Sequence, residues 1–319
     1  MLSLHQLRCF LATYEHGSLT AAAESLGYAQ PSVSEQVRQL EQTLGARLFQ
    51  RVGRGVVPTE AADVLRPHAE RALASADSGR QAVAAVGALE TGTVRFGIFG
   101  TARLYLGSAL VADVLAAHPG VRVELIGQHS RAVEEDLRRG RLEAAMIALP
   151  VLDQTMSVRP VAREELVYIS ADPERLRAPV TPRQLADATL VLPEATWRTG
   201  DSSRRLLTQA VQEVGGTLQT RIEVEDVETA VEVVEKGLAD SVVPRGVISE
   251  LRPRLGPHVG WVSMRPRLFD TFAIVHRGDA VLSPAARLAI DIAVARIQSV
   301  CEPIGPKVAP RRSSGAARR

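Results

Sequence analysis

The chain has 319 residues, 45% hydrophobic and 23% charged, a balance that is typical of a globular protein with about two or three domains. Its net charge of +2 excludes a broadly basic surface, so any nucleic-acid binding must rest on focused contacts. Two distant cysteines make neither a disulfide framework nor a metal site, and no apolar run reaches the roughly 18 residues of a membrane span.

The N-terminal stretch MLSLHQLRCFLATYEHG lacks the basic region and the small-residue cleavage site of a signal peptide. We therefore expect a soluble, cytoplasmic protein with no membrane association. Cys9 and Cys301 are expected to be unpaired thiols, as suits a reducing compartment.

Three helices are expected in the first 44 residues. The first covers Ser3–Glu15 and ends before Gly17, and Ser18 is a plausible N-cap for the second, Leu19–Leu26. Gly27 supplies the positive φ of a helix C-terminus, and Pro31 suits the first turn of the third helix. Two helices joined by a tight glycine turn indicate a helix-turn-helix.

The third helix lies in the stretch AQPSVSEQVRQLEQTLGARLF, residues 29–49. An apolar stripe recurs at helical spacing: Val33, Val37, Leu40 and Leu44. The opposite side carries Pro31, Glu35, Arg38 and Gln42, flanked by Ser32, Ser34 and Gln39. The residues alone leave two interpretations open, an ordinary solvated face or a surface that reads DNA.

The next segment, Gly45–Pro58, has the pattern of a hairpin with Arg51 and Arg54 at its tip. A long Ala-rich helix is expected over Thr59–Glu90, with Pro67 as a possible bend. Its apolar stripe has no obvious partner in its own chain, so a second copy of the helix is the natural partner.

From residue 91 strands alternate with helices, beginning with TVRFGIF at 93–99 and continuing to a last helix at Pro284–Gln298. This alternation predicts a mostly parallel α/β sheet. Residues 301–319 are rich in Pro, Gly, Ser and Arg and carry five basic residues against Glu302, a net +4. We expect that segment to be a disordered basic tail.

Three pieces in the first 62 residues carry a specific resemblance: SLTAAAESL, QPSVSEQVRQLE and LGARLFQR, in this order and spacing. Weaker matches are GIFGT at 97–101, LRRGRLEAAMI at 137–147 and VEKGLADSVVP at 234–244. With these motifs the chain resembles the LysR-type transcriptional regulators from about residue 4 to residue 297.

The resemblance implies an α/β fold class with an N-terminal, mostly α-helical winged helix-turn-helix, a long linker helix and a two-lobed effector domain like that of periplasmic binding proteins. The implied domains are 1–58 for DNA binding, 59–90 for the dimerising linker, 91–300 for effector binding and 301–319 for the tail. Within the effector domain, lobe 1 covers about 91–160 and 265–300, and lobe 2 about 161–264.

With the resemblance, DNA reading becomes the favoured interpretation of the third helix. Base edges would be met by Gln30, Pro31, Ser32, Ser34 and Glu35, with Gln36 nearer the apolar border. Glu35 stands where many relatives carry Arg or Gln; it either accepts a hydrogen bond from cytosine N4 or is merely solvated. Arg38 is long enough to reach a phosphate or a guanine, and phosphate is favoured. Arg51 and Arg54 are expected to contact phosphate or the minor groove, the alternative being a solvated hairpin tip. Ser18 and Thr20, with helix-terminal amides, are expected to donate to the DNA backbone, although Ser18 equally fits a plain cap.

Two hydroxyl residues, Thr101 and Ser130, each follow a strand and begin a helix, where amides and the helix dipole favour an anion. Both also fit plain N-caps, but the resemblance places effector contacts in these loops. Trp197 and Arg198 suit an aromatic or carboxylate group, or else surface packing. The complete set of expected effector residues is Thr101, Gln128, Ser130, Trp197, Arg198, Thr199 and Glu228. The expected effector is a small organic acid or a related metabolite.

Other function classes have weaker support. An enzyme is disfavoured because the seven histidines are scattered and no phosphate loop, nucleophile elbow or metal spacing is present. A solute-binding protein shares the two-lobed body but not the DNA-reading module, and a repressor without a ligand is the nearest rival. We expect no cofactor, and as partners promoter DNA, the effector, a homodimer or homotetramer and RNA polymerase.

Overall fold

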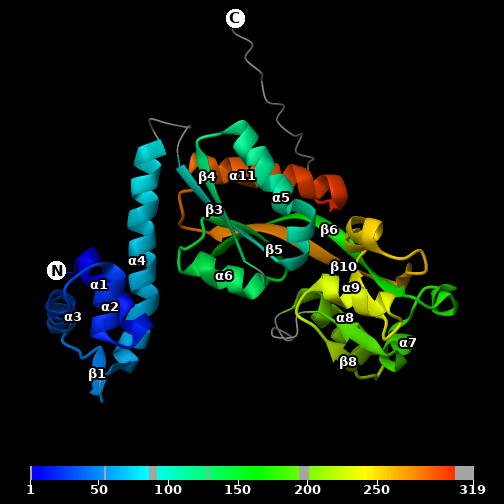
Figure 1. Cartoon of the computed structure of the whole chain (residues 1–319), viewed down its shortest axis with the longest axis horizontal. Helices are drawn as coiled ribbons and strands as arrows, with labels where there is room; N and C mark the ends of the chain where they lie inside the picture. The colour runs from blue at the N-terminus through cyan, green and yellow to red at the C-terminus, as the bar shows by residue number, and fades with distance from the viewer. Residues whose placement is uncertain (1, 54, 86–91, 128, 194–200, 306–319) are drawn as a thin grey trace, which may run out of the picture. The chain divides into compact units, whose positions relative to one another are not determined.

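The computed structural model describes residues 2–53, 55–85, 92–127, 129–193 and 201–305 (Figure 1). The chain divides into two compact units, which are taken separately below. The first contains residues 1–84 together with 138–141, and the second contains residues 85–137 and 142–319. No helix in the described ranges is both long and apolar enough to cross a membrane.

The first unit contains three helices, a two-stranded hairpin and a long helix. Their bounds are α1 Leu4–His16, α2 Leu19–Leu26, α3 Gln30–Leu44, β1 Phe49–Val52, β2 Gly55–Pro58 and α4 Glu60–Ala85. The helix-turn-helix predicted from local signals is confirmed. Ser18 accepts a hydrogen bond from the amide of Ala21 at 3.4 Å, and Gly27 ends α2 with a φ of 69°.

One close backbone approach joins the hairpin to the helices of this unit. The amide of Val56 donates to the carbonyl oxygen of Gly17 at 2.8 Å. A Cβ at Gly55 would lie 2.9 Å from that same oxygen, so the approach requires glycine at this position. The hairpin is therefore held beside the turn between α1 and α2.

The core of the first unit is built from Phe10, Val33, Leu40 and Leu48, all at most 1% exposed. The predicted apolar stripe of α3 is thus buried at Val33, Val37 and Leu40. Its fourth member, Leu44, is 38% exposed, because α3 ends there and the stripe runs out of partners. Burial of this stripe directs the opposite face of α3 to solvent.

The second unit is built on a seven-stranded sheet (Figure 1). Its first part contains β3 Gly92–Ile98, α5 Gly100–Ala117, β4 Val121–Ile126, α6 Ser130–Arg138 and β5 Ala144–Ala148, with β3 parallel to both β4 and β5. The final helix, α11 Pro284–Val300, packs with α5 against these strands. We call this group of elements the first lobe.

Two long antiparallel strands, β6 Met156–Ser170 and β10 Gly260–Arg277, lead from the first lobe to the second. We call the following group the second lobe: η1 Pro173–Leu176, α7 Pro182–Asp187, β7 Leu190–Leu192, α8 Ser202–Glu213, β8 Thr220–Glu223, α9 Val227–Glu235, β9 Ser241–Pro244, α10 Arg245–Leu251 and η3 Arg252–Arg254. β7 is parallel to β8, and β9 pairs with β6.

The sheet differs from the prediction in one respect. A mostly parallel sheet was expected, but the β6–β10, β10–β5 and β6–β9 pairs are antiparallel, so the sheet is mixed. The prediction missed this pairing because β6 and β10 are long strands, and the sequence pattern showed only shorter pieces of each. Each strand runs through a proline, Pro160 and Pro266, and these interrupt the apparent pattern.

The chain end also departs from the expected tail over residues 301–305. Cys301 is buried, and Glu302–Pro303 form a short strand, β11, that pairs with β6. Burial of the thiol and pairing with a sheet edge order a segment whose composition suggested disorder. Both cysteines are free, as predicted. Residues 306–319 lie outside the described residues.

Gly97 in β3 offers a test of packing in the second unit. A Cβ there would lie 2.5 Å from Cγ1 of Val133 and 2.7 Å from Cβ of Ala145, so α6 would have to move away from the sheet. We expect Gly97→Ala to destabilise the unit by about 1–3 kcal/mol in denaturant unfolding.

The matched control is Gly107→Ala. Gly107 lies in α5, where an added Cβ meets only Cγ of Arg103, at 3.8 Å. Alanine should stabilise that helix by roughly 0.5–1 kcal/mol. Equal effects of the two substitutions would contradict the close packing of α6 over Gly97.

Candidate nucleic-acid interface and ligand cleft

The solvent-facing side of α3 presents the residues expected to read DNA. Pro31 lies in the first turn, and the N-cap residue, Ala29, makes no side-chain cap hydrogen bond. The N-terminal amides of this helix therefore keep the partial positive charge of an uncapped terminus. Pro31, Ser32 and Arg38 are exposed. Gln30, Ser34, Glu35 and Gln36 are partly exposed.

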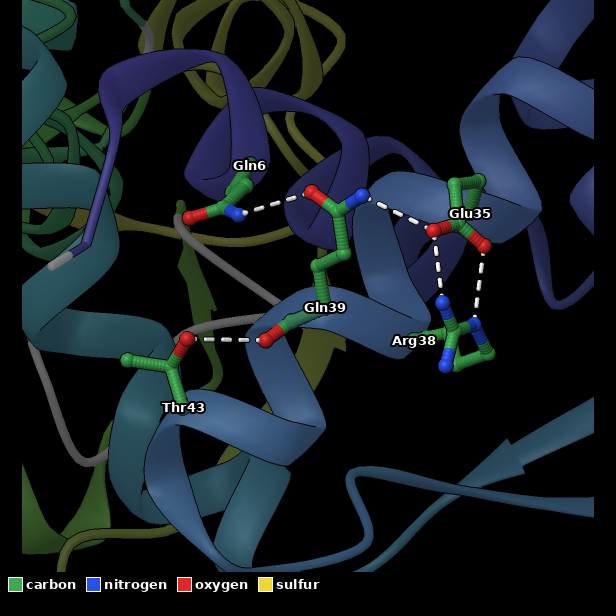
Figure 2. A network of polar contacts seen from close by, with 5 residues as sticks. All are labelled: Gln6, Glu35, Arg38, Gln39 and Thr43. Carbon is green, nitrogen blue, oxygen red and sulfur yellow. Dashed lines mark hydrogen bonds and ion pairs between the residues drawn. The ribbon is translucent and has the colours of Figure 1, made fainter.

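A polar network on α3 fixes the carboxylate of Glu35 (Figure 2). Arg38 donates to it twice, from Nε to Oε2 at 2.8 Å and from Nη2 to Oε1 at 2.6 Å. Gln39 donates to Oε1 at 2.8 Å, and Gln6 of α1 donates to the Gln39 amide oxygen at 3.5 Å (Figure 2). Glu35 is thus held from two sides.

These donors, chiefly Arg38, lower the pKa of Glu35 to about 2, so the carboxylate is ionised at neutral pH. Both side chains of the pair remain accessible, with 54% of Arg38 and 43% of Glu35 exposed. The sequence favoured a phosphate contact for Arg38, but in the structure its guanidinium group donates two hydrogen bonds to Glu35. The i,i+3 spacing of the two residues was the available signal for this pair.

The remaining expected DNA contacts lie on α2 and the hairpin. The hydroxyl of Ser18 is used as the N-cap of α2, whereas Thr20, two residues later, is exposed. Arg51 is exposed on β1, opposite Val56 of β2. Gly53, with a φ of 58°, begins the hairpin turn, and Arg54 lies outside the described residues.

The second unit contains a cleft of about 180 Å³ between its lobes. The first lobe contributes the start of α5 and the residue before α6, and the second lobe contributes the ends of β7 and β9 and the starts of α8 and α9. The described polar side chains on its wall are Thr101, Arg103, His129, Asp201, Ser203, Arg204, Glu225, Asp226, Glu228 and Asp270.

The structure brings two of the expected effector residues, Thr101 and Glu228, to this wall. Ser130 is not among the described lining residues; its hydroxyl accepts a hydrogen bond from the amide of Ala148, at 3.3 Å. Gln128, Trp197, Arg198 and Thr199 lie outside the described residues. Sequence reasoning therefore supplied only part of the described wall.

Two side-chain contacts join the lobes across the cleft. Arg103 of α5 lies 2.8 Å from Glu228 of α9, measured from Nη2 to Oε1. His129, before α6, lies 2.8 Å from Glu225, measured from Nε2 to Oε1. Each pair is a direct contact between the first lobe and the second. Sequence reasoning missed Arg103, His129 and Glu225, because residues far apart along the chain give no local signal of pairing.

A buried carboxyl group, that of Asp270 on β10, lies in the cleft wall. It is 2% exposed and accepts hydrogen bonds from the hydroxyls of Ser202 and Ser203 at 3.0 and 2.9 Å. Burial, and then repulsion from Asp201, raises the pKa of Asp270 to about 7. Asp201 caps α8 by accepting from the amide of Arg204, and burial raises its pKa as well. The one signal for Asp270 was an acid within the apolar run LFDTFAIV.

Comparison with known proteins decides the family. The family model described as "LysR substrate binding domain" matches residues 87–298. The family model described as "Bacterial regulatory helix-turn-helix protein, lysR family" matches residues 4–63. The chain belongs to the LysR family of bacterial transcriptional regulators. It combines a DNA-binding helix-turn-helix with an α/β effector-binding domain, as its resemblance to the family predicted.

Curated relatives and solved structures agree with this assignment. The nitrogen assimilation regulatory protein Nac of Klebsiella aerogenes is 28% identical over 294 residues, 91% of this chain and 94% of Nac. The regulator CbbR of Rhodospirillum rubrum is 26% identical over 246 residues, 77% of this chain and 80% of CbbR.

Among solved structures, full-length OxyR from Pseudomonas aeruginosa is 25% identical with a TM-score of 0.73, over 96% of this chain and 99% of OxyR. Full-length CbnR in complex with its target DNA has a TM-score of 0.62 at 20% identity, over 92% of this chain and 99% of CbnR. At that identity the likeness to CbnR shows the fold alone.

The buried carboxyl of Asp270 has a consequence for stability. Its pKa is about 7 in the folded protein, against an ordinary value of 3.8, so the folded state binds more protons between these pH values and loses stability as pH rises through them. Asp270→Asn removes this dependence. We expect its stability relative to the unsubstituted protein to increase by roughly 2–3 kcal/mol between pH 5 and pH 8, measured by unfolding at both pH values.

Proposed function

We propose that this LysR-family chain acts in the cytoplasm as a homo-oligomeric regulator without enzymatic activity, and that a small effector in the interlobe cleft controls its binding to promoter DNA. The observation that carries the DNA part is the solvent-facing polar side of α3, whose opposite side is buried in the core. A helix held in this way presents its N-terminal half to a major groove.

We assign base contacts to the expected residues of α3: Gln30, Pro31, Ser32, Ser34, Glu35 and Gln36. Arg51 of the hairpin, with Arg54, is assigned to phosphate, and Thr20 and Ser18 to the backbone beside α2. The ionised, anchored state of Glu35 supports a role as acceptor toward cytosine N4, since a fixed carboxylate loses little entropy on pairing.

We assign oligomerisation to α4. Val64 and Val83 on this helix are 63% and 75% exposed. A long helix with exposed valines is suited to pair with a second copy of itself. Dimers paired into tetramers would offer several helix-turn-helix units to spaced half-sites and to RNA polymerase.

The coupling from cleft to DNA is assigned to lobe closure. Arg103–Glu228 and His129–Glu225 both cross from the first lobe to the second, so a ligand that competes for either pair changes the free-energy difference between open and closed lobes. A ligand controls DNA binding only to the extent that its affinity differs between these two states.

The hairpin arginine gives the first test. If Arg51 contacts phosphate, Arg51→Ala should weaken binding to the DNA flanking the protein's own gene and to an unrelated duplex by a similar few-fold factor. The slope of log affinity against log salt should fall by about 0.9. Fluorescence anisotropy across a salt series measures both. Arg183→Ala, which removes an exposed arginine from α7, is the control. A changed preference between the two duplexes with an unaltered slope would refute the phosphate assignment.

The Glu35–Arg38 pair gives the second test. In the free protein Glu35 neutralises Arg38 and repels phosphate, so Glu35→Gln should raise affinity for unrelated DNA, about three- to tenfold at low salt. Arg38→Gln alone should lower that affinity by a similar factor, because it leaves the carboxylate of Glu35 without its counter-charge. The double variant completes the cycle. If Glu35→Gln instead lowered affinity for unrelated DNA, the pair would not restrain Arg38.

A further inference from the structure

The cleft wall contains two carboxyl groups, those of Asp201 and Asp270, that form no ion pair with a described residue, although Arg204, Arg205 and His129 act electrostatically on Asp201. Among the described residues, the carboxylate of Asp270 accepts hydrogen bonds from the hydroxyls of Ser202 and Ser203 and from the amide of Thr271. The carboxylate of Asp201 accepts one from the amide of Arg204 at 2.6 Å. Within the described residues neither makes an ion pair, although both line the cavity. A buried carboxylate without a cation is costly, and a cationic ligand would offset that cost.

The described arginines of the wall are already paired with other acids. Arg103 pairs with Glu228. Arg204 donates to Glu223 at 2.8 Å and to the carbonyl of Pro193 at 3.1 Å. The acids of the wall that form no ion pair with a described residue are Asp201, Asp226 and Asp270, and Asp226 is exposed and already bonded to Thr229. Asp201 and Asp270 select for a group that carries positive charge and several N–H donors.

The first lobe presents the opposite chemistry to the same cavity. The 18-residue helix α5 begins at Gly100, and its N-cap residue, Phe99, makes no side-chain cap hydrogen bond. Gly100 and Thr101, at this uncapped terminus, both line the cleft. Free amides and the helix dipole favour an anionic group here. On the second lobe, Nε of Arg204 is buried and has no hydrogen-bond partner among the described residues.

We propose that the effector is a compact zwitterion of the amino-acid class, with its ammonium group at Asp201 and Asp270 and its carboxylate at the amino terminus of α5. This inference rests on the proposed role of the cleft as the effector site. The cavity of about 180 Å³ has room for a small metabolite. The organic acid expected from the sequence would satisfy only the α5 end.

The test uses the full-length protein and matched ligands. Each of the twenty L-amino acids is compared, by thermal shift and then calorimetry, with the acid that lacks its amino group and the amine that lacks its carboxylate. We expect at least one amino acid to bind, with both of its counterparts weaker by about tenfold or more. Equal binding of the amino-free acid, or no binding by any amino acid, would overturn the proposal.

Substitutions locate the ammonium site. Asp270→Asn and Asp201→Asn should each lower the affinity for the amino acid by about tenfold or more. The weaker affinity for the amino-free acid should stay unchanged. Glu164→Gln is the matched control, because Glu164 is also a buried carboxyl of this unit but does not line the cleft. Thermal unfolding and circular dichroism verify that each variant is folded. Unaltered affinity in Asp270→Asn and Asp201→Asn would place the ligand elsewhere.

Failure of this inference is distinguishable from failure of the proposed function. Specific binding to the DNA flanking the gene, measured without ligand, reports on the regulator alone. If that DNA is bound and only amino-free acids occupy the cleft, the proposal of a zwitterionic effector is wrong, but the proposed regulatory function is retained. If an amino acid binds through Asp270 but never changes DNA binding, the ligand class stands and the effector role fails.

Discussion

The antiparallel pairing of β6 with β10 is the interaction on which the ligand-binding unit depends. The two strands remain paired from Met156 and Arg277 in the first lobe to Ser170 and Gly260 in the second. Because each strand belongs to both lobes, the cleft forms beside them, and Asp270 on β10 enters its wall. Side-chain contacts such as that between Arg103 and Glu228 also join the lobes, and we propose that a ligand displaces them. A continuous backbone with displaceable contacts is the arrangement that a two-state switch requires.

In the DNA-binding unit, a carboxylate lies on α3, the helix that we propose to face DNA. Glu35 holds the guanidinium of Arg38 and is itself anchored through Gln39 to Gln6 on α1. Such an acid lowers affinity for phosphate in general and so lowers binding to unrelated sequences. Specificity is a difference of affinities, and a repulsive element can supply it as well as a new contact. The modest net charge of the chain fits a protein that depends on focused contacts.

The parts of the fold that depend on neighbouring residues were predictable, and those that depend on distant pairing were not. Ser18, Gly27 and Pro31 act within one turn of the chain, so their signals placed α2 and α3. By contrast, Arg103 and Glu228 are 125 residues apart, and no periodicity connects them. Cys301 lies in a segment whose composition resembles a tail, yet the thiol is buried and the next residues extend the sheet edge. The resemblance to the family supplied the two lobes, but not the acids of their cleft.

The central claim is that occupation of the cleft changes how the protein holds DNA. The most direct measurement is a nuclease footprint of the full-length protein on the DNA flanking its own gene, with and without a ligand that raises its melting temperature. The account predicts protection of a partly symmetric site with spaced half-sites, and a changed pattern of protection when the ligand is present. Specific protection that stays identical at saturating ligand would contradict it.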